Sequence, residues 1–145
     1  MPAHPNSINL NSDILIVDDE IPNIQLLTQV LADAGYQALR SAKRPQLAIE
    51  SALAQPPSLI LLDVRMPEMN GFEVCRRLKQ EARTRDIPVI FVSSLQDAQD
   101  RIRGFEAGGA DFISKPFQVP EVLVRVRTHL ALRNMQLHLE DLVAR

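Results

Sequence analysis

Three aspartates, two serines and a lysine each come at the end of a short apolar run of the sequence or next to it. In chain order they are Asp18, Asp19, Asp63, Ser93, Ser94 and Lys115. Carboxylates that converge in a small space repel one another, so such a group either raises a carboxyl pKa or binds a cation. Oxygen ligands without a cluster of His or Cys favour Mg²⁺, which commonly shares its ligands between carboxylates and phosphate oxygens. The residue types therefore indicate a magnesium and phosphate site.

Asp63 is the candidate nucleophile of this site, because a carboxylate that attacks phosphorus forms an acyl phosphate. A bound metal would offset the charge of Asp63 against that of the incoming phosphoryl group. Lys115 supplies a mobile positive charge for phosphate oxygens, and Ser93 supplies a hydroxyl donor. Together these side chains form an electrostatic cradle, which predicts transfer of a phosphoryl group to Asp63.

Each of these residues also has a structural explanation when it is considered alone. Asp18 and Asp19 could cap a following helix, and Asp63 could be an ordinary turn residue. Ser93 could be a helix cap, and Lys115 could be a solvated surface charge. What favours a functional site is the joint placement, because unrelated features at four strand ends would be an improbable coincidence.

Five strand-like runs alternate with helical patterns, and this alternation would bring the polar residues together. The runs are Ile14–Val17, Tyr36–Leu39, Leu59–Leu62, Val89–Val92 and Asp111–Ser114. Between them lie apolar residues with helical spacing: Ile24, Leu27 and Leu31; Leu47, Ile49 and Leu53; Phe72, Cys75 and Leu78; Ile102 and Phe105. Such a repeated alternation with short connections predicts a parallel sheet with helices on both faces.

The carboxyl ends of the strands are where an open doubly wound sheet binds its ligands. The binding crevice lies where the winding direction reverses, which for strand order 2-1-3-4-5 is between the first and third strands. With that order, Asp18, Asp19 and Asp63 would line one pocket.

The composition describes one domain of ordinary size. A chain of 145 residues with 46% hydrophobic residues can bury one substantial core and is short for two domains. Its formal net charge of -2 creates no overall field that would attract nucleic acid or an anionic membrane. Cys75 is the single cysteine, which excludes an intramolecular disulfide and fits a reducing, cytoplasmic location. No apolar stretch approaches the roughly 18 residues that span a bilayer.

Four motifs, taken together, resemble the receiver family of response regulators in two-component signalling. They are Ile14-Leu-Ile-Val-Asp-Asp-Glu20, Leu61-Leu-Asp-Val-Arg-Met-Pro-Glu-Met-Asn-Gly71, Pro88-Val-Ile-Phe-Val-Ser-Ser94 and Asp111-Phe-Ile-Ser-Lys-Pro-Phe117. Their order and spacing match that family over about residues 13 to 130, and the combination is specific although each motif alone is weak. We therefore expect an α/β flavodoxin-like fold of five βα units, with strand order 2-1-3-4-5 and an extended C-terminal helix.

The resemblance also implies a metal site and a phosphoryl donor. Asp18 and Asp19 would hold Mg²⁺ directly or through water, Asp63 would both ligate it and accept the phosphoryl group, and Arg65 would contribute its backbone carbonyl. The donor would be a phosphohistidine on a sensor histidine kinase or a phosphotransfer protein. The chain would then be a signalling receiver that catalyses only its own phosphorylation and dephosphorylation.

A switch is the second implication of the resemblance. Ser93 would follow the phosphoryl group, Lys115 would pair with it, and Phe112 would be an aromatic switch that turns inward when Ser93 moves. The moving surface would consist of the fourth helix, fifth strand and fifth helix. The Lys115–Pro116 bond resembles one that is cis in the family and that aims the lysine at the pocket.

Some residues depart from the family pattern or have no role in it. Asn70 stands where Asp is frequent and Ser94 where Ala or Gly is frequent, and neither change removes a catalytic atom. We interpret the glycines as loop and helix-end residues, and we assign the histidines no role because they share no metal-ligand spacing. These residues are Gly71, Gly104, Gly108 and Gly109, and His4, His129 and His138.

The C-terminal part of the sequence stays helical from Val119 to its end. A first strip of apolar residues would face the core, and a later heptad-like stripe would project beyond the domain. We expect a flexible tail over residues 1–12, a receiver domain over 13–130, and an extension over 131–145 that forms a homodimer or links to an output domain. The alternative is a final helix packed on its own sheet. The strip is Val122, Leu123, Val126 and Leu130, and the stripe is Leu132, Met135, Leu139 and Leu142.

Other functions fit parts of the pattern. A haloacid-dehalogenase-like phosphohydrolase needs a second Asp two residues after the nucleophile, where this chain has Arg65. A flavodoxin-like FMN carrier needs a loop of Ser, Thr and Gly after the first strand, where this chain is acidic. Two alternatives stay open: a module that changes partners without phosphate, and the regulatory part of a larger cyclase, phosphodiesterase or hybrid kinase. In every case we expect no direct contact with nucleic acid or a membrane.

Overall fold

The computed structural model describes residues 10–94 and 98–144, in which five strands alternate with five helices. The strands are β1 (Asp13–Val17), β2 (Ala38–Ala42), β3 (Leu59–Asp63), β4 (Val89–Ser93) and β5 (Asp111–Ser114). The helices are α1 (Ile21–Asp33), α2 (Pro45–Ala54), α3 (Gly71–Gln80), α4 (Ala98–Glu106) and α5 (Val119–Ala144).

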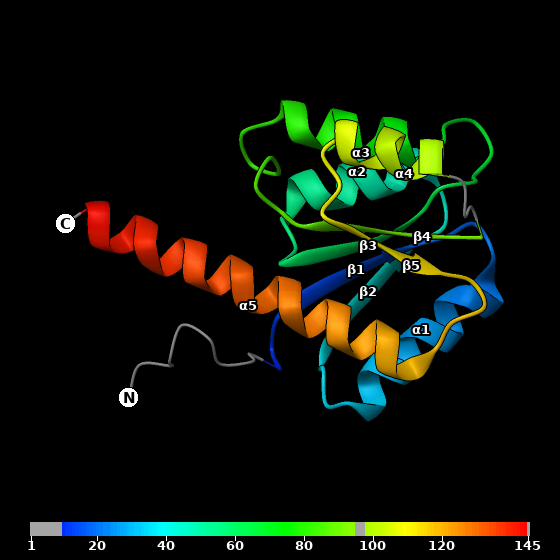
Figure 1. Ribbon diagram of the computed structural model, residues 1–145, viewed down its shortest axis with the longest axis horizontal. Coiled ribbons are helices and arrows are strands. Elements are labelled where there is room, and N and C mark those ends of the chain that lie inside the picture. Colours follow the sequence, from blue (N-terminus) through cyan, green and yellow to red (C-terminus); the bar gives the residue numbers. More distant parts are fainter. Residues whose placement is uncertain (1–9, 95–97, 145) are drawn as a thin grey trace.

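The strands form one parallel sheet in the order β2-β1-β3-β4-β5, which confirms the expected doubly wound fold. Helices α2, α3 and α4 cover one face of the sheet, and α1 and α5 cover the other (Figure 1). Strands β3 and β4 are buried along their whole length, as their uninterrupted apolar runs indicate. The carboxyl ends of β1 and β3 lie side by side, because Val17 is paired with Leu62.

Each face of the sheet has its own apolar core, because successive side chains of a strand point to opposite faces. Leu15 and Leu62 belong to the core under α2 and α3, whereas Ile14 and Leu61 belong to the core over α1 and α5. These two apolar cores hold the sheet between its two layers of helices. The strand ends, and the polar residues attached to them, are therefore fixed in space.

Three details of the sequence interpretation were wrong. Strand β2 begins at Ala38, so Tyr36 precedes it and Ala42 ends it. In α2, Leu47 is half exposed, and small residues such as Ala48 face the core in its place. Residues Ile102 and Phe105 of α4 are more than half exposed, so the two apolar residues that suggested this helix are not the ones that it buries.

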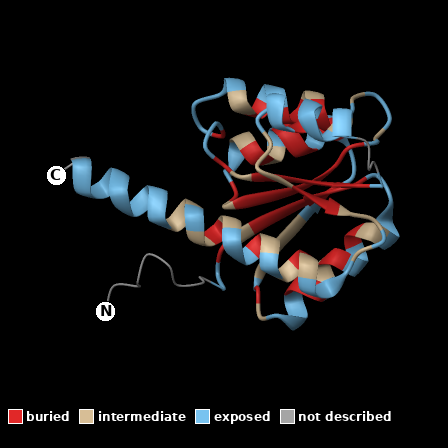
Figure 2. Cartoon of the chain, viewed as in Figure 1, coloured by how far each residue is buried: buried red, intermediate tan, exposed pale blue. Residues whose placement is uncertain are grey.

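Helix α5 extends well past the edge of the sheet (Figure 1). The first strip is buried, with Val122 and Val126 fully covered, whereas Leu132 and Leu139 of the later stripe are 54% and 58% exposed. Figure 2 shows the change from buried to exposed residues along this helix. The later stripe therefore does not pack on the protein's own sheet. Residues 1–9 of the expected tail and Arg145 lie outside the described residues.

Candidate functional site

The three aspartates converge at the carboxyl edge of the sheet, where β1 and β3 end next to each other. Asp63 is the last residue of β3, and Asp18 follows β1 directly. Asp18 and Asp63 are almost fully buried, while Asp19 is exposed. One carboxylate oxygen from each residue lies within 4.8 Å of the others. The sheet therefore places three negative charges around a space the size of one cation.

Lys115 is the cation that reaches this group from the end of β5. Its Nζ lies 3.0 Å from Oδ1 of Asp63 and 3.4 Å from Oδ2 of Asp18. The Lys115–Pro116 peptide bond is cis, as the resemblance implied. The other oxygen of Asp18 accepts a 2.9 Å hydrogen bond from the backbone N–H of Glu20. Lys115 thus links both buried carboxylates but does not balance their charge.

The pKa values of the site reflect this incomplete balance. Burial raises the pKa of Asp63 to about 6, and the charge of Asp18 adds to the effect, while the hydrogen bond from Lys115 opposes it. Burial also raises the pKa of Asp18, although the Glu20 N–H and Lys115 oppose it. For Lys115, burial would lower the pKa, but the hydrogen bond and charge of Asp63 outweigh it and raise the pKa. The ionised site is therefore short of positive charge.

A cavity of about 320 Å³ opens over these groups. Its lining includes Asp63, Arg65, Ser93 and Lys115, all of which the sequence assigned to the site. Ser93 is buried at the end of β4, whereas Arg65 and Ser94 are exposed on the cavity wall. The structure therefore gathers the expected nucleophile, hydroxyl donor and cation around one open space.

The loop after β3 is held tightly against the site by Gly71 and Asn70. A Cβ at Gly71 would lie 2.3 Å from the backbone oxygen of Asp63, so only glycine fits there without moving this loop. The Gly71 N–H donates to the Val64 carbonyl at 2.8 Å. Asn70 caps α3 by accepting a 3.0 Å hydrogen bond from the Glu73 N–H. Asn70 therefore performs a capping function that Asp would also perform.

The donor set fits Mg²⁺ better than softer metals. Among the described residues, the cluster that could hold a metal consists of Asp18, Asp19 and Asp63, with oxygen donors and no His or Cys. The raised pKa of Asp63 indicates that further positive charge would be favourable there. The site thus suits a hard divalent cation that keeps part of its water shell.

Comparison with known proteins agrees with this geometry. The family model of the response regulator receiver domain matches residues 14–127. This chain belongs to the response regulator receiver family. Receiver domains take phosphoryl groups from sensor kinases, and they bind Mg²⁺ in general. The chain is thus the receiver component of two-component signalling.

Two curated relatives of this receiver are longer regulatory proteins, and the receiver matches only part of each. It is 42% identical over 120 residues to the DNA-binding dual master transcriptional regulator RpaA of Synechocystis, and 41% identical over 119 residues to the response regulator PleD of Caulobacter vibrioides. These matches cover 81% and 82% of the chain but 48% and 26% of those relatives. The receiver therefore spans half or less of their length.

A solved structure supports the same fold. The signal receiver domain of a signal transduction histidine kinase from Syntrophus aciditrophicus matches with a TM-score of 0.76 and 36% identity, over 83% of this chain and 90% of that one. Across 10–94 and 98–144, no helix of the receiver is both long and apolar enough to cross a membrane.

The aromatic residue of the expected switch points inward in this receiver. Phe112 is 7% exposed, and its ring centroid lies 5.3 Å from that of Phe91 and 5.8 Å from that of Phe105. Phe91 in turn contacts Phe72 at 5.1 Å. A chain of four rings therefore connects α3, β4, β5 and α4.

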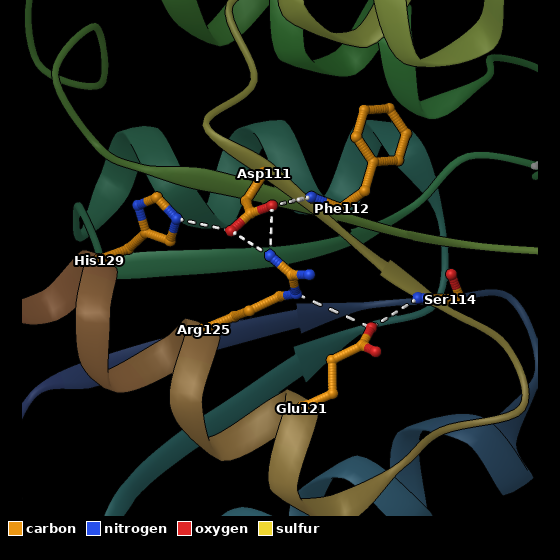
Figure 3. Close-up of polar contacts among 6 residues, drawn as sticks. All are labelled: Asp111, Phe112, Ser114, Glu121, Arg125 and His129. Atoms are coloured by element: carbon orange, nitrogen blue, oxygen red, sulfur yellow. Dashed lines mark hydrogen bonds and ion pairs between the residues drawn. The ribbon is translucent and has the colours of Figure 1, made fainter. Parts of the chain in front are cut away.

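A polar network between β5 and α5 was not foreseen from the sequence, in which His129 had no assigned role. Nη1 of Arg125 donates to both carboxylate oxygens of Asp111 at 2.9 Å, and Nε2 of His129 lies 3.0 Å from Oδ2 (Figure 3). The Phe112 N–H also donates to Asp111, at 2.8 Å. The spacing of Arg125 and His129, four residues apart on one helix face, is the signal that could have indicated a shared partner.

Proposed function

We propose that Asp63 accepts a phosphoryl group from a phosphohistidine of a sensor histidine kinase or phosphotransfer protein. The observation that carries this proposal is the position of Asp63: buried at the end of β3, with one lysine at 3.0 Å, two further carboxylates nearby and an open cavity above it. Such a carboxylate is shielded from bulk water and accessible to a donor from one side.

Transfer would form one bond and break another. An Asp63 oxygen forms the new bond to phosphorus, while the P–N bond to the donor imidazole breaks and the nitrogen keeps the electron pair. Lys115, which is paired with Asp63, would balance charge on the phosphoryl oxygens, and Ser93, which lines the same cavity, would donate its hydroxyl to one of them. Mg²⁺, when held by Asp18, Asp19, Asp63 and the Arg65 carbonyl, would neutralise charge between the carboxylates and the phosphoryl group.

The receiver would lose the phosphoryl group by attack of water on phosphorus, which releases Asp63 unchanged. Its catalysis is therefore limited to its own phosphorylation and dephosphorylation. The exposed Ser94 on the cavity wall would influence this second step.

The domain divisions belong to the same proposal. Residues 13–130 form the receiver, and 131–145 form an extension whose exposed stripe, Leu132, Met135, Leu139 and Leu142, suits a homodimer or a helical link to an output domain. Phosphorylation would act through the surface of α4, β5 and α5, with Ser93 and Phe112 as the moving parts. The balanced charge of the chain favours protein partners over direct contact with nucleic acid or a membrane, and the buried free thiol of Cys75 suits the cytoplasm.

The test is intact-mass analysis after incubation with acetyl phosphate, with Mg²⁺ and with a chelator. Wild type is expected to gain one phosphoryl group in Mg²⁺ alone, and Asp63→Asn is expected to gain none. Asp86→Asn, an exposed aspartate far along the chain from the site, is the matched control and should behave like wild type. Hydroxylamine should remove the added mass, because it attacks acyl phosphates and leaves serine phosphates intact.

A gain that survives in Asp63→Asn, or that resists hydroxylamine, would contradict the proposal and point to a serine. No gain in folded wild-type protein, beside a receiver that is labelled in parallel, would favour the module that changes partners without phosphate.

A further inference from the structure

The residue that helix α4 buries against the domain is a glycine. Gly104 is the buried residue among the described residues of α4, whereas the large side chains of Ile102 and Phe105 are 54% and 53% exposed. Gly104 lies in the last turn of the helix, in keeping with the helix-end position that the sequence suggested. Glycine is among the poorest helix formers, so its presence there indicates a requirement for space.

The space that a side chain at Gly104 would need is filled by Phe112. A Cβ on Gly104 would lie 2.4 Å from Cζ and 2.8 Å from Cε2 of the Phe112 ring, well inside contact distance. Its next neighbour, Cδ2 of Phe91, would be at 3.1 Å. The inward ring of Phe112 and a side chain at position 104 therefore exclude each other.

The ring of Phe112 can move more easily than its backbone. Strand β5 pairs Phe112 with Phe91 of β4, and the Phe112 N–H donates to the Asp111 carboxylate, which Arg125 and His129 hold in turn. Figure 3 shows the ring pointing away from this network. Rotation about the Cα–Cβ bond is thus the movement that would relieve an overlap at Gly104.

We propose that the absence of a side chain at Gly104 leaves room for the inward orientation of the Phe112 ring. The residue at position 104 would then set the ratio of inward to outward rings in the unphosphorylated receiver. A methyl group at position 104 would exclude the ring from α4 and favour its outward position. The link to signalling rests on the proposed function, in which Ser93 and Phe112 respond to the phosphoryl group on Asp63. The steric part of the proposal concerns the unphosphorylated chain alone.

The first test follows the Phe112 ring by ¹³C NMR in protein with ¹³C-labelled phenylalanine rings, because a fluorine on Cζ would itself occupy the space beside Gly104. The chain has five phenylalanines, and the Phe112 resonance is identified by its loss in Phe112→Leu. In wild type this resonance should be little broadened by a soluble paramagnetic agent, because the ring is buried. In Gly104→Ala it should move and be broadened by the agent. A Phe112 resonance that stays unshifted and unbroadened in folded Gly104→Ala would overturn the proposal.

Two controls separate this effect from general damage to α4. Arg101→Ala, an exposed change on the same helix, should leave the Phe112 resonance as in wild type. Gly104→Ala is then made in a Phe112→Ala background, where the ring is absent. There it should raise the urea midpoint, because alanine is the better helix former, whereas in wild type it should not. An equal loss of midpoint in both backgrounds would assign the clash to Phe91 or the helix and overturn the proposal.

The link to signalling is tested last, by the rate of Mg²⁺-dependent labelling with acetyl phosphate. If molecules with the inward ring are the ones that are labelled readily, Gly104→Ala should label severalfold more slowly than wild type, because a smaller fraction of its molecules has the inward ring. An unchanged rate with a displaced ring would overturn the link to phosphorylation while leaving the steric result intact. Failure of wild type to label would instead contradict the proposed function.

Discussion

Asp63 is the last residue of one strand and Asp111 is the first residue of another, and their surroundings have opposite effects on the carboxyl pKa. Asp63 ends β3, is 4% exposed, and has Lys115 as its cation and Asp18 as a nearby negative charge. Asp111 begins β5 and accepts from Arg125, His129 and a backbone N–H. The first carboxylate is short of positive charge, and the second has abundant donors.

The pKa values express this difference. Burial raises the pKa of Asp63 to about 6, and the hydrogen bond from Lys115 does not cancel the effect. Burial also acts to raise the pKa of Asp111, but the hydrogen bonds from His129, the Phe112 N–H and Arg125 outweigh it and lower that pKa. A buried carboxylate that has one cation and nearby negative charges suits a cation and a phosphoryl group, whereas one with several donors suits a structural role.

The largest effect on the labelling rate is expected when the positive charge of Lys115 is removed from beside Asp63. Lys115→Met should slow labelling by acetyl phosphate by about 10²–10³, the usual cost of one preorganised group that stabilises charge. The measurement is the initial rate of mass gain in Mg²⁺. Lys43→Met, at an exposed lysine, is the matched control. A Lys115→Met rate close to that of wild type would mean that Lys115 does not contact the transferred group.

Neutralising Asp63 should stabilise the metal-free protein. Its pKa is raised from 3.8 to about 6, so its protonated form stabilises the fold below about pH 4, and this contribution is lost as the pH rises through about 6. Since each pKa unit corresponds to about 1.4 kcal/mol, Asp63→Asn should gain up to about 3 kcal/mol in free energy of unfolding near neutral pH. Urea unfolding with a chelator present, at about pH 7.5 and pH 4, measures it.

The gain from Asp63→Asn should shrink towards the lower pH, because wild type is then protonated in both states. If Asp63→Asn gained the same free energy of unfolding at both pH values, the buried negative charge of Asp63 would not be the cause of the gain. In excess Mg²⁺ the gain should also fall, since a cation bound to wild type stabilises the folded state by mass action.

The sequence was informative wherever a strand was buried on both sides. Runs such as Leu59–Leu62 have few alternatives to a central parallel strand, and a polar residue after such a run must lie at the carboxyl edge. The predicted positions of Asp18, Asp63 and Lys115 followed from this rule, and the structure brings them together. Local pattern and global topology coincide at this edge.

The sequence was less informative at edges and on α4. Strand β2 is an edge strand in which Arg40 pairs with Asp13, so its limits depend on tertiary contacts that a period of two does not reveal. On α4 the residue that faces the core is Gly104, which carries no apolar signal. The partners of Asp111 come from α5, and their distance in sequence hid them. Packing across elements, not local propensity, decides all three.

Removing the charge of Asp111, the carboxylate with several donors, should lower the stability of the protein without loss of phosphoryl transfer. Asp111→Asn leaves the partly buried Arg125 and His129 without a charged acceptor, so the free energy of unfolding should fall by about 1–3 kcal/mol. Urea unfolding at neutral pH measures the loss, and Asp86→Asn should show little change. Labelling by acetyl phosphate should remain dependent on Mg²⁺ and Asp63. A loss of labelling in folded Asp111→Asn would mean that the two aspartates are coupled.

The smallest effect is the pH dependence of the Asp111 network. The lowered pKa of Asp111 means that its ionised form stabilises the fold above the pKa of the unfolded chain, and that this contribution disappears as the pH falls through the folded value. The stability difference between wild type and Asp111→Asn should therefore narrow on acidification because wild type loses stability, whereas the difference for Asp63→Asn narrows because wild type gains stability on protonation. Urea titrations of both variants over the same acidic range compare the two. If the Asp111 difference instead stayed constant down to low pH, its partners would contribute by packing and shape, and the difference in charge balance between the two carboxylates would not explain the separate roles proposed for Asp111 and Asp63.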